Sequence, residues 1–449
     1  MPIRRALRFD GARVVRALIP AIAAVALGAC NSLLDVTNPN NVGSEALEDP
    51  SASAAIIAGA ENSTARGLAS ILNPYTIASD ETYWVGSRDA YYQIDQGGIA
   101  DPNNEYVNSA FFNLGEARWL GDQAITQLSK FNADGKLPDK TQLVRAYLNG
   151  AVMYTNLADQ FNDMTFSDRT VAGPNIGEAN MVSLYDSATK WLTAAVALGP
   201  TGEMKNQVYA MRARANFSKA LWQLIHPVGK TPTNPLVNSA AAVADANAAL
   251  AGMTTDERFD IVTTPNNRGD NSGGGFGFEM NSRVEQTPDT GLATTDPNSK
   301  KPNAVTGKDP VTGVVDAALS KNMLRITNGG NDIPLTQTSQ REMYLILAEA
   351  ALAAGNNAGF DSNINLLRAI DGKAAYTGTG PSRLQLLIWE RRVNLIFQGR
   401  RLNDMYRFGV KDGRWLASSV EARLPGCGFS IPLAEAQSNP EITGTTACK

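Results

Sequence analysis

A series of long amphipathic segments restricts how this chain can fold more than any other feature. In residues 108–131, apolar side chains recur at intervals of three and four, which is typical of a helix with one buried face. Further segments with helical patterns are residues 51–67, 140–161, 182–198, 206–225, 339–356 and 361–370. Short polar connections between segments of about 20 residues favour antiparallel helix pairs. We therefore predict an all-α fold of tetratricopeptide-like helix pairs in a superhelical array, although no strict repeat of about 34 residues is visible.

The helical pattern is interrupted in the second half of the chain. From residue 252 to about residue 316, Gly, Asn, Asp, Thr and Pro dominate and periodicity is lost. We predict a single domain over residues 51–449. Its parts are a helical region (51–250), a large loop-rich insert (252–338), a second helical region (339–409) and a tail (410–449). Residues 73–108 mix aromatic and polar side chains and are predicted to form a long loop.

The first residues have the order of a secretory signal. Five arginines are followed by an apolar stretch from Ala17 to Leu27 and then by small residues. The apolar stretch is too short to span a membrane, which takes about 20 residues. The run Leu27-Gly28-Ala29-Cys30 resembles the bacterial lipobox, in which the cysteine becomes the lipidated first residue. We predict that residues 1–29 are a signal peptide that is removed, that Cys30 carries lipid, and that residues 30–50 form a lipid-anchored tether.

The cysteine count is consistent with this prediction. The chain has three cysteines, and lipidation of Cys30 leaves the pair Cys427 and Cys448. Both lie in a tail rich in Gly, Pro and Thr, and a lipoprotein tail lies outside the cytoplasm, where disulfides persist. We predict a disulfide that closes a loop of about 20 residues. The alternative is two free thiols.

Composition excludes several kinds of site. A net charge of −4 argues against general nucleic-acid binding, which needs a positive field. The single histidine, His226, rules out a multi-histidine metal site, and we expect it to lie at the end of a helix. No 12-residue calcium loop is present, and the run at residues 273–278, GGGFGF, lacks the context of a phosphate-binding loop. We predict no metal, no cofactor and no catalytic residue.

Residues 389–409, WERRVNLIFQGRRLNDMYRFG, concentrate five arginines in an acidic chain. A nucleic-acid patch, a catalytic cluster and a structural helix with paired charges are the three alternatives. Apolar residues at i, i+4, i+7 and i+8 from Trp389 form a buried stripe, which predicts a helix that ends or bends at Gly399. Because the arginines flank apolar stripes instead of forming one face, we favour the structural alternative, with Glu390, Asp404 and Asp412 as partners.

Several stretches, in order along the chain, resemble the RagB/SusD family of nutrient-binding outer-membrane lipoproteins. The resemblance begins with the segment that follows the lipobox and ends close to residue 442, so it covers almost the whole mature chain. One stretch departs from the family pattern, because residues 162–165 read Asn-Asp-Met-Thr where a Gly-Asp-Val-Pro run is usual. The matching stretches are CNSLLDVTNPN (30–40), LVRAYLNGAVMYTNLADQFNDMTF (143–166), REMYLILAEAALAAGN (341–356), ERRVNLIFQGRRLNDMYRFG (390–409) and FSIPLAEAQSNPEI (429–442).

This resemblance implies an all-α, SusD-like fold whose helix pairs support a loop-rich binding face. It implies a surface lipoprotein of the outer membrane, facing the cell exterior, that binds a glycan or a peptide without catalysis. It also implies a partner, a SusC-like TonB-dependent outer-membrane transporter, over which such proteins lie as a lid. The arginine stretch is then scaffold.

The best candidate for a ligand site is residues 79–98, SDETYWVGSRDAYYQIDQGG. Aromatic rings stack on the apolar faces of sugars, and exposed rings on loops are better candidates than rings on helix faces. The alternative is that these rings pack the loop onto the helices. Phe276 and Phe278 are a second candidate, whereas Trp119, Trp191, Trp222 and Trp389 are assigned to the core. The predicted ligand contacts are Asp80, Tyr83, Trp84, Arg88, Tyr91 and Tyr92.

Two other functions remain open at this stage. Asp80, Glu81 and Asp89 lie near the aromatic residues, and a glycoside hydrolase needs two carboxylates about 5 to 9 Å apart. No motif supports that activity. A lipid-anchored helical scaffold that binds proteins only is the third possibility.

Overall fold

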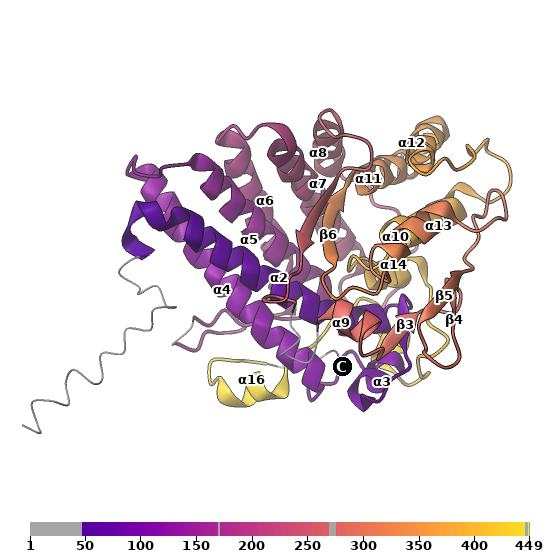
Figure 1. Ribbon diagram of the computed structural model, residues 1–449, viewed down its shortest axis with the longest axis horizontal. Coiled ribbons are helices and arrows are strands. Elements are labelled where there is room, and N and C mark those ends of the chain that lie inside the picture. The colour runs from indigo at the N-terminus through magenta and orange to yellow at the C-terminus, as the bar shows by residue number, and fades with distance from the viewer. Residues whose placement is uncertain (1–46, 169–170, 269–274, 445–447, 449) are drawn as a thin grey trace, which may run out of the picture. The chain divides into compact units, whose positions relative to one another are not determined.

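The computed structural model describes residues 47–168, 171–268, 275–444 and 448 (Figure 1). The predicted signal peptide, the lipidation site Cys30 and most of the predicted tether lie outside the described residues. Residues 53–449 form one compact unit, and a separate unit precedes it. In that first unit the described part is a short turn ending in the 3-10 helix η2 (Pro50–Ala52).

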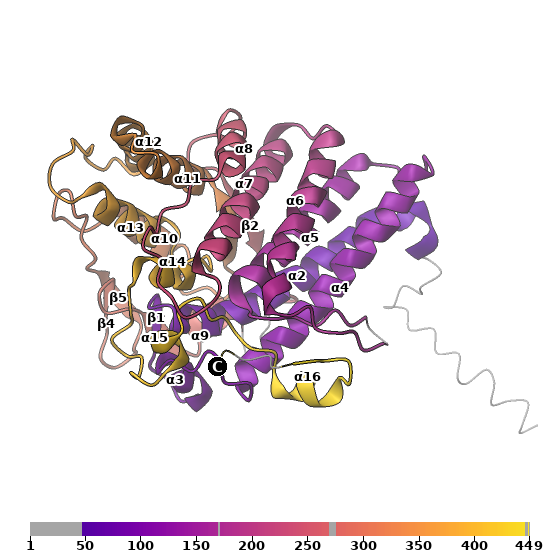
Figure 2. The ribbon, with the colours of Figure 1, turned by 180° about the vertical axis from the view of Figure 1, so that it is seen from behind.

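Long helices lie side by side in chain order, as Figures 1 and 2 show from opposite sides. Each packs mainly on the next helix in the array. Side-chain caps begin many of them, as when Asn104 accepts hydrogen bonds from the first turn of α4. This arrangement confirms the predicted all-α fold of helix pairs. The helices of the array are α2 (Ser53–Ala78), α4 (Glu105–Ala133), α5 (Lys140–Gln160), α6 (Val182–Ala197), α7 (Gly202–Ile225), α8 (Ala240–Leu250), α11 (Gln340–Ala353) and α12 (Asn357–Ala369).

The first helix is longer than the sequence pattern indicates. We expect a helix to about residue 67 and a loop from residue 73, but α2 continues through Pro74 to Ala78. All of its side chains from Gly67 to Ala78 are buried. A helix buried on every side shows no polar face, so periodicity does not reveal it. The rest of the predicted loop holds the strand β1 (Thr82–Trp84) and the helix α3 (Asp89–Asp95).

The insert predicted as loop-rich contains short regular elements. Its strands take part in three two-stranded antiparallel sheets: β3 pairs with β1, which lies outside the insert, β2 pairs with β6, and β4 pairs with β5. Most are too short to show alternation in the sequence. The elements are β2 (Arg258–Val262), α9 (Phe276–Asn281), β3 (Gln286–Pro288), β4 (Ala293–Thr295), β5 (Pro302–Val305), α10 (Ala317–Leu324) and β6 (Pro334–Ser339).

The remaining elements are short and close the fold. A disulfide joins Cys427 to Cys448 across 21 positions of the chain and attaches the tail near Asn162. His226 lies at the C-terminal cap of α7, as expected, and its ring stacks on Trp222 with ring centres 3.8 Å apart. The short elements are η3 (Glu178–Asn180), α13 (Arg383–Asn394), α14 (Arg401–Phe408), α15 (Val420–Arg423) and α16 (Leu433–Ser438).

The arginine stretch is structural. Arg391 and Arg407 converge on the buried carboxylate of Asp404, at 2.8 and 2.9 Å, and Arg407 also pairs with Glu349. Burial acts to raise the pKa of Asp404, but the two guanidinium groups hold that pKa below its usual range. The predicted partner Asp404 is therefore correct.

The other two predicted partners are wrong. Glu390 pairs with Arg368 and Lys373, and Asp412 pairs with Arg414, so neither carboxylate binds an arginine of the stretch. Arg368 and Lys373 precede the stretch, and Arg414 follows it. The spacing of charges within the stretch therefore does not indicate these pairs.

The helix in this stretch also ends earlier than predicted. Helix α13 stops at Asn394, five residues before Gly399. Phe397 has a positive φ of 61°, a conformation that non-glycine residues rarely adopt. Its backbone N–H donates to the buried carboxylate of Glu81 at 2.8 Å. A contact with a residue more than 300 positions away therefore replaces the last helical turn.

Candidate ligand-binding site

The predicted ligand segment begins where α2 ends. Strand β1 pairs with β3 so that Thr82, Tyr83 and Trp84 lie opposite Pro288, Thr287 and Gln286. The buried side chain of Gln286 accepts hydrogen bonds from the hydroxyl groups of Thr76 and Thr82, at 2.9 and 2.6 Å. Its amide group donates to Asn73 at 2.8 Å. One side chain from the insert therefore fixes β1 to the end of α2.

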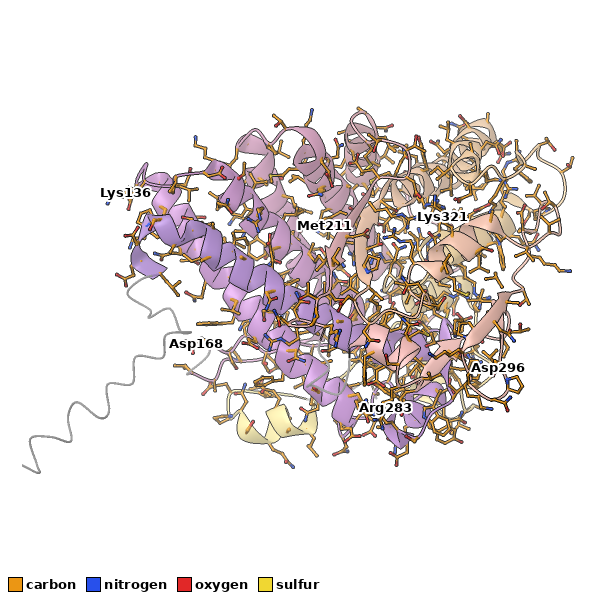
Figure 3. All side chains as sticks on the ribbon, viewed as in Figure 1. Lys136, Asp168, Met211, Arg283, Asp296 and Lys321 are labelled. Atoms are coloured by element: carbon orange, nitrogen blue, oxygen red, sulfur yellow. A yellow bond between two sulfur atoms is a disulfide. The ribbon has the colours of Figure 1, made fainter. Side chains whose placement is uncertain are left out.

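A glutamate of the insert, Glu285, fixes the turn after β1. The carboxylate of Glu285 accepts the backbone N–H groups of Ser87 and Arg88, at 2.7 and 2.9 Å. Burial acts to raise the pKa of Glu285, but these bonds and the bond from Arg283 (labelled in Figure 3) lower it overall. Gly86 lies so close that an added Cβ would come within 2.0 Å of the carboxylate. The turn therefore requires glycine and leads directly into α3.

Trp84 and Tyr92 form the accessible part of the predicted site. Their ring centres are 5.2 Å apart and their planes are tilted by 55°. Tyr92 is 46% exposed, whereas Trp84 is half-buried against the core. The indole Nε1 of Trp84 is buried and has no hydrogen-bond partner among the described residues. The pair therefore presents one exposed ring and one partly covered ring.

The other two predicted tyrosines lie elsewhere. Tyr91 is buried and stacks on Tyr106 with ring centres 4.0 Å apart, so it packs α3 onto α4. Burial raises the pKa of Tyr91 well above its usual value. Tyr83 is half-buried, and the guanidinium of Arg414 lies 5.3 Å from the centre of its ring. Successive strand residues face opposite sides, so Tyr83 and Trp84 do not form one platform.

Arg88 and Asp80, the two charged residues among the predicted ligand contacts, are held by ion pairs. Arg88 binds Glu279 at 2.5 Å and lies over the ring of Tyr106, 5.2 Å from its centre. Burial raises the pKa of Glu279 to about 7, although Arg88 acts to lower it. Asp80 is buried and accepts two hydrogen bonds from Arg401, at 2.7 and 3.0 Å. Arg88 lies between Trp84 and Tyr92 in the sequence, whereas Asp80 is buried and joins the start of β1 to Arg401.

The three carboxylates considered for hydrolysis do not share one environment. Asp80 is occupied by Arg401, and Glu81 is buried beneath Phe397. Asp89 is exposed in the first turn of α3. Burial raises the pKa of Glu81 to about 8, so that carboxyl is largely protonated at neutral pH. The pair Asp80 and Glu81 is therefore covered, and only Asp89 reaches solvent.

The second aromatic candidate is divided by the structure. Phe276 is completely buried and contacts Phe397 edge-on, with ring centres 5.6 Å apart. Phe278 is half-buried. By contrast, Trp119, which we assigned to the core, is half-buried along a groove of about 430 Å³ that also exposes Phe112. The seven-residue spacing of Phe112 and Trp119 on α4 was the available signal for that groove.

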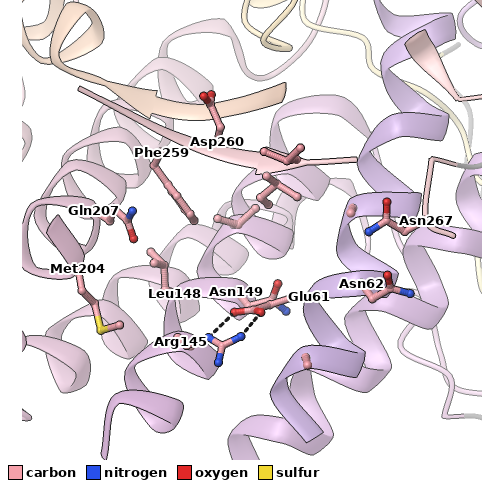
Figure 4. A pocket seen from close by; sticks show the side chains of 15 residues that line it. Glu61, Asn62, Arg145, Leu148, Asn149, Met204, Gln207, Phe259, Asp260 and Asn267 are labelled. Atoms are coloured by element: carbon pink, nitrogen blue, oxygen red, sulfur yellow. Dashed lines mark hydrogen bonds and ion pairs between the residues drawn. The ribbon is translucent and has the colours of Figure 1, made fainter. Parts of the chain in front are cut away.

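A larger cavity of about 480 Å³ lies beneath strand β2, between α2, α5 and α7 (Figure 4). Its polar residues are spread over helices and a strand, so no local sequence pattern indicates the cavity. Across the described ranges, no three His, Cys, Asp or Glu side chains gather as a metal site would require. In the same residues, no helix is both long enough and apolar enough to cross a membrane.

Comparisons with known proteins find a family match over part of the chain and solved structures with the same fold. Residues 245–436 match the model of the SusD family. A comparison with curated protein sequences finds no match. Among solved structures, a SusD superfamily protein of Bacteroides thetaiotaomicron VPI-5482 has a TM-score of 0.64 at 12% identity, covering 89% of this chain and 100% of the other.

Two further structures have the same fold. A SusD superfamily protein of Bacteroides vulgatus ATCC 8482 has a TM-score of 0.61 at 12% identity, covering 88% of this chain and 98% of the other. A laminarin-binding SusD-like protein has a TM-score of 0.58 at 14% identity, covering 88% and 99%. The match of the family model over residues 245–436, the shared fold and the motifs in the sequence make this chain similar to the RagB/SusD family.

Proposed function

We propose that this protein binds a nutrient glycan at the surface formed by Trp84 and Tyr92, without catalysis. The observation that carries the proposal is the exposed ring of Tyr92 packed against Trp84 on a rigid support of β1, β3 and α3. A ring held in this way offers an apolar face to a sugar at little entropic cost. The laminarin-binding protein of the same fold makes a glycan the preferred ligand class.

Neighbouring polar groups complete this proposed surface. Arg88 and Ser87 belong to the turn that Glu285 fixes, and Gln93 is exposed beside Tyr92. Hydroxyl groups of a sugar need such donors and acceptors around the stacked ring. Asp80 and Tyr91 act indirectly in this proposal, since both are buried and support the elements that carry Trp84 and Tyr92.

The test is binding of the purified full chain to laminarin oligosaccharides and other glycans by calorimetry. We expect Tyr92→Ala to weaken binding about tenfold, the equivalent of about 1.4 kcal/mol. Phe112→Ala is the matched control, because Phe112 is an exposed aromatic residue of a different groove and leaves the site intact. Equal losses in both variants, or preferential binding of peptides, contradict the proposal. Release of reducing sugar from any bound glycan contradicts its non-catalytic part.

We also propose that Cys30 anchors the chain by lipid to the outer membrane, on the side facing the cell exterior. The lipobox-like run Leu27-Gly28-Ala29-Cys30 supports this anchor. The resemblance to the RagB/SusD family supports, as part of this proposal, a SusC-like TonB-dependent transporter as the partner that receives the glycan.

The partner is tested by mild-detergent pull-down of the tagged full chain from its native membranes, with mass identification of all retained proteins. A stoichiometric β-barrel of transporter size is the expected result, and a Cys30→Ser variant is expected to leave the membrane fraction. A chain recovered alone, or only with periplasmic proteins, counts against delivery to a transporter and favours a protein-binding scaffold.

A further inference from the structure

The cavity beneath β2 has features of a ligand site and lies apart from the aromatic pair. It is lined by one face of α2 near Glu61, whereas Trp84 follows the other end of that helix. With a rise of about 1.5 Å per residue, the helix separates the two by about 25 Å. Its volume of about 480 Å³ falls within the range of small-molecule sites, roughly 300 to 1,000 Å³.

The charges in this cavity cancel. Arg145 and Glu61 bind each other through two hydrogen bonds on its floor, and Asp260 is turned to the other side of β2, where it binds Arg325 and Thr336 (Figure 4). A charged ligand would therefore have to compete with existing ion pairs. The cavity instead suits an uncharged ligand.

Side-chain amides supply the remaining polar groups. Asn149 lines the cavity and is 5% exposed, but its amide nitrogen is buried on the side of Gly121 of α4, without a hydrogen-bond partner among the described residues. Because that nitrogen is covered, Asn149 offers the cavity its amide oxygen, which accepts hydrogen bonds. The amide groups of Asn267 and Gln207 extend into the cavity from opposite sides (Figure 4). Phe259 enters from above, so one apolar ring faces three amides.

We infer that this cavity is a second ligand subsite, which takes an uncharged, hydroxyl-rich unit such as a neutral sugar residue. Amides offer a donor and an acceptor each, which matches hydroxyl groups that do both. The ring of Phe259 matches the apolar face of a sugar. In naming a saccharide as the ligand, the inference rests on the proposed function.

The test uses Asn149→Leu in the full chain. Replacing an unpaired buried amide by an apolar side chain of similar size is expected to keep or raise the urea midpoint of unfolding. The same change is expected to weaken binding at the cavity at least tenfold. A purely structural role for Asn149 predicts the opposite, a lower midpoint. Asn247→Ala, which removes an exposed amide on α8, is the control and is expected to change neither.

The probes are laminarin oligosaccharides, oligogalacturonate as a charged sugar, and a short uncharged peptide. We expect two laminarin oligosaccharides per chain, with protection of residues 258–262 from hydrogen exchange that Asn149→Leu abolishes and Tyr92→Ala leaves. One oligosaccharide per chain, lost in Tyr92→Ala and unaffected by Asn149→Leu, overturns this inference and leaves the proposed function standing. The reverse pattern supports the cavity and contradicts the aromatic site. Preferential protection of β2 by the peptide or by oligogalacturonate also overturns the inference.

Discussion

The buried guanidinium of Arg401 donates two hydrogen bonds, of 2.7 and 3.0 Å, to the carboxylate of Asp80. Asp80 has a positive φ of 51° and lies between the end of α2 and the start of β1. Arg392 approaches the same carboxylate at 3.4 Å. Burial acts to raise the pKa of Asp80, but Arg401 and then Arg392 hold that pKa below its usual range. The pair joins the arginine stretch to the base of the aromatic site.

Removing this carboxylate is expected to be costly. Asp80→Asn leaves Arg401 buried without its counter-charge, which should lower the free energy of unfolding by about 3 to 5 kcal/mol. Urea denaturation followed by circular dichroism measures the change. Asp361→Asn is the control, because Asp361 pairs with Arg383 at a partly exposed position where such pairs contribute about 1 kcal/mol or less. Similar losses in the two variants would show that the Asp80 pair does not carry this role.

Stability should fall as pH rises from about 4.5 to about 8, in part because of Glu81. Burial raises the pKa of this carboxyl to about 8 in the folded chain, from a usual value of 4.5. The folded state therefore holds a proton that the unfolded state has released, and each unit of pH costs about 1.4 kcal/mol over that window. Below pH 4.5 the contribution is fully present, and above pH 8 it is lost.

Glu81→Gln removes this titration while keeping an oxygen to accept the N–H of Phe397. We expect the variant to gain roughly 3 to 5 kcal/mol relative to wild type between pH 4.5 and pH 8, measured as the difference between their urea denaturation curves. A difference that stays constant with pH would mean that Glu81 does not titrate in this window.

The turn before α3 should not tolerate a side chain at residue 86. Gly86→Ala places a Cβ about 2.0 Å from the carboxylate of Glu285, so that the hydrogen bonds to Ser87 and Arg88 must break. We expect glycan affinity to fall at least tenfold, measured by calorimetry, since the turn sets the position of α3. Gly115→Ala, a helical position with no atom within 4 Å of the added Cβ, should instead stabilise the chain by about 0.5 to 1 kcal/mol. Unchanged glycan affinity of the Gly86→Ala protein would show that the turn does not position the binding site.

The disulfide should stabilise the tail. Cys427 and Cys448 close a loop of 21 residues, for which loop entropy gives about 3 kcal/mol. The Cys427→Ser, Cys448→Ser double variant should lose about that much, and reductant should change wild type but not the variant. No response of wild type to reductant under unfolding conditions would contradict a stabilising bond.

Sequence patterns were sufficient for the helix array and not for the site. Apolar spacing in α4, α5 and α7 reflects local burial of one face, so the sequence carries that information directly. The turn at Gly86 depends instead on Glu285, and the end of α13 depends on Glu81, both from distant parts of the chain. Tyr91 and Tyr92 are neighbours of the same type, yet one is buried and the other exposed. Only the packing of α3 on α4 decides that Tyr91 is buried and Tyr92 is exposed.

The pairing of β1 with β3 also determines when the aromatic site can fold during synthesis of the chain. Trp84 and its strand partner Gln286 are separated by about 200 residues, and the helices α4 to α8 lie between them. Those helices have mostly local contacts and can form as the chain emerges, at roughly 5 to 20 residues per second. Strand β1 must wait at least about ten seconds for its partner at that rate. The aromatic site is therefore among the last parts of the molecule to mature, although its rings are among the first to be made.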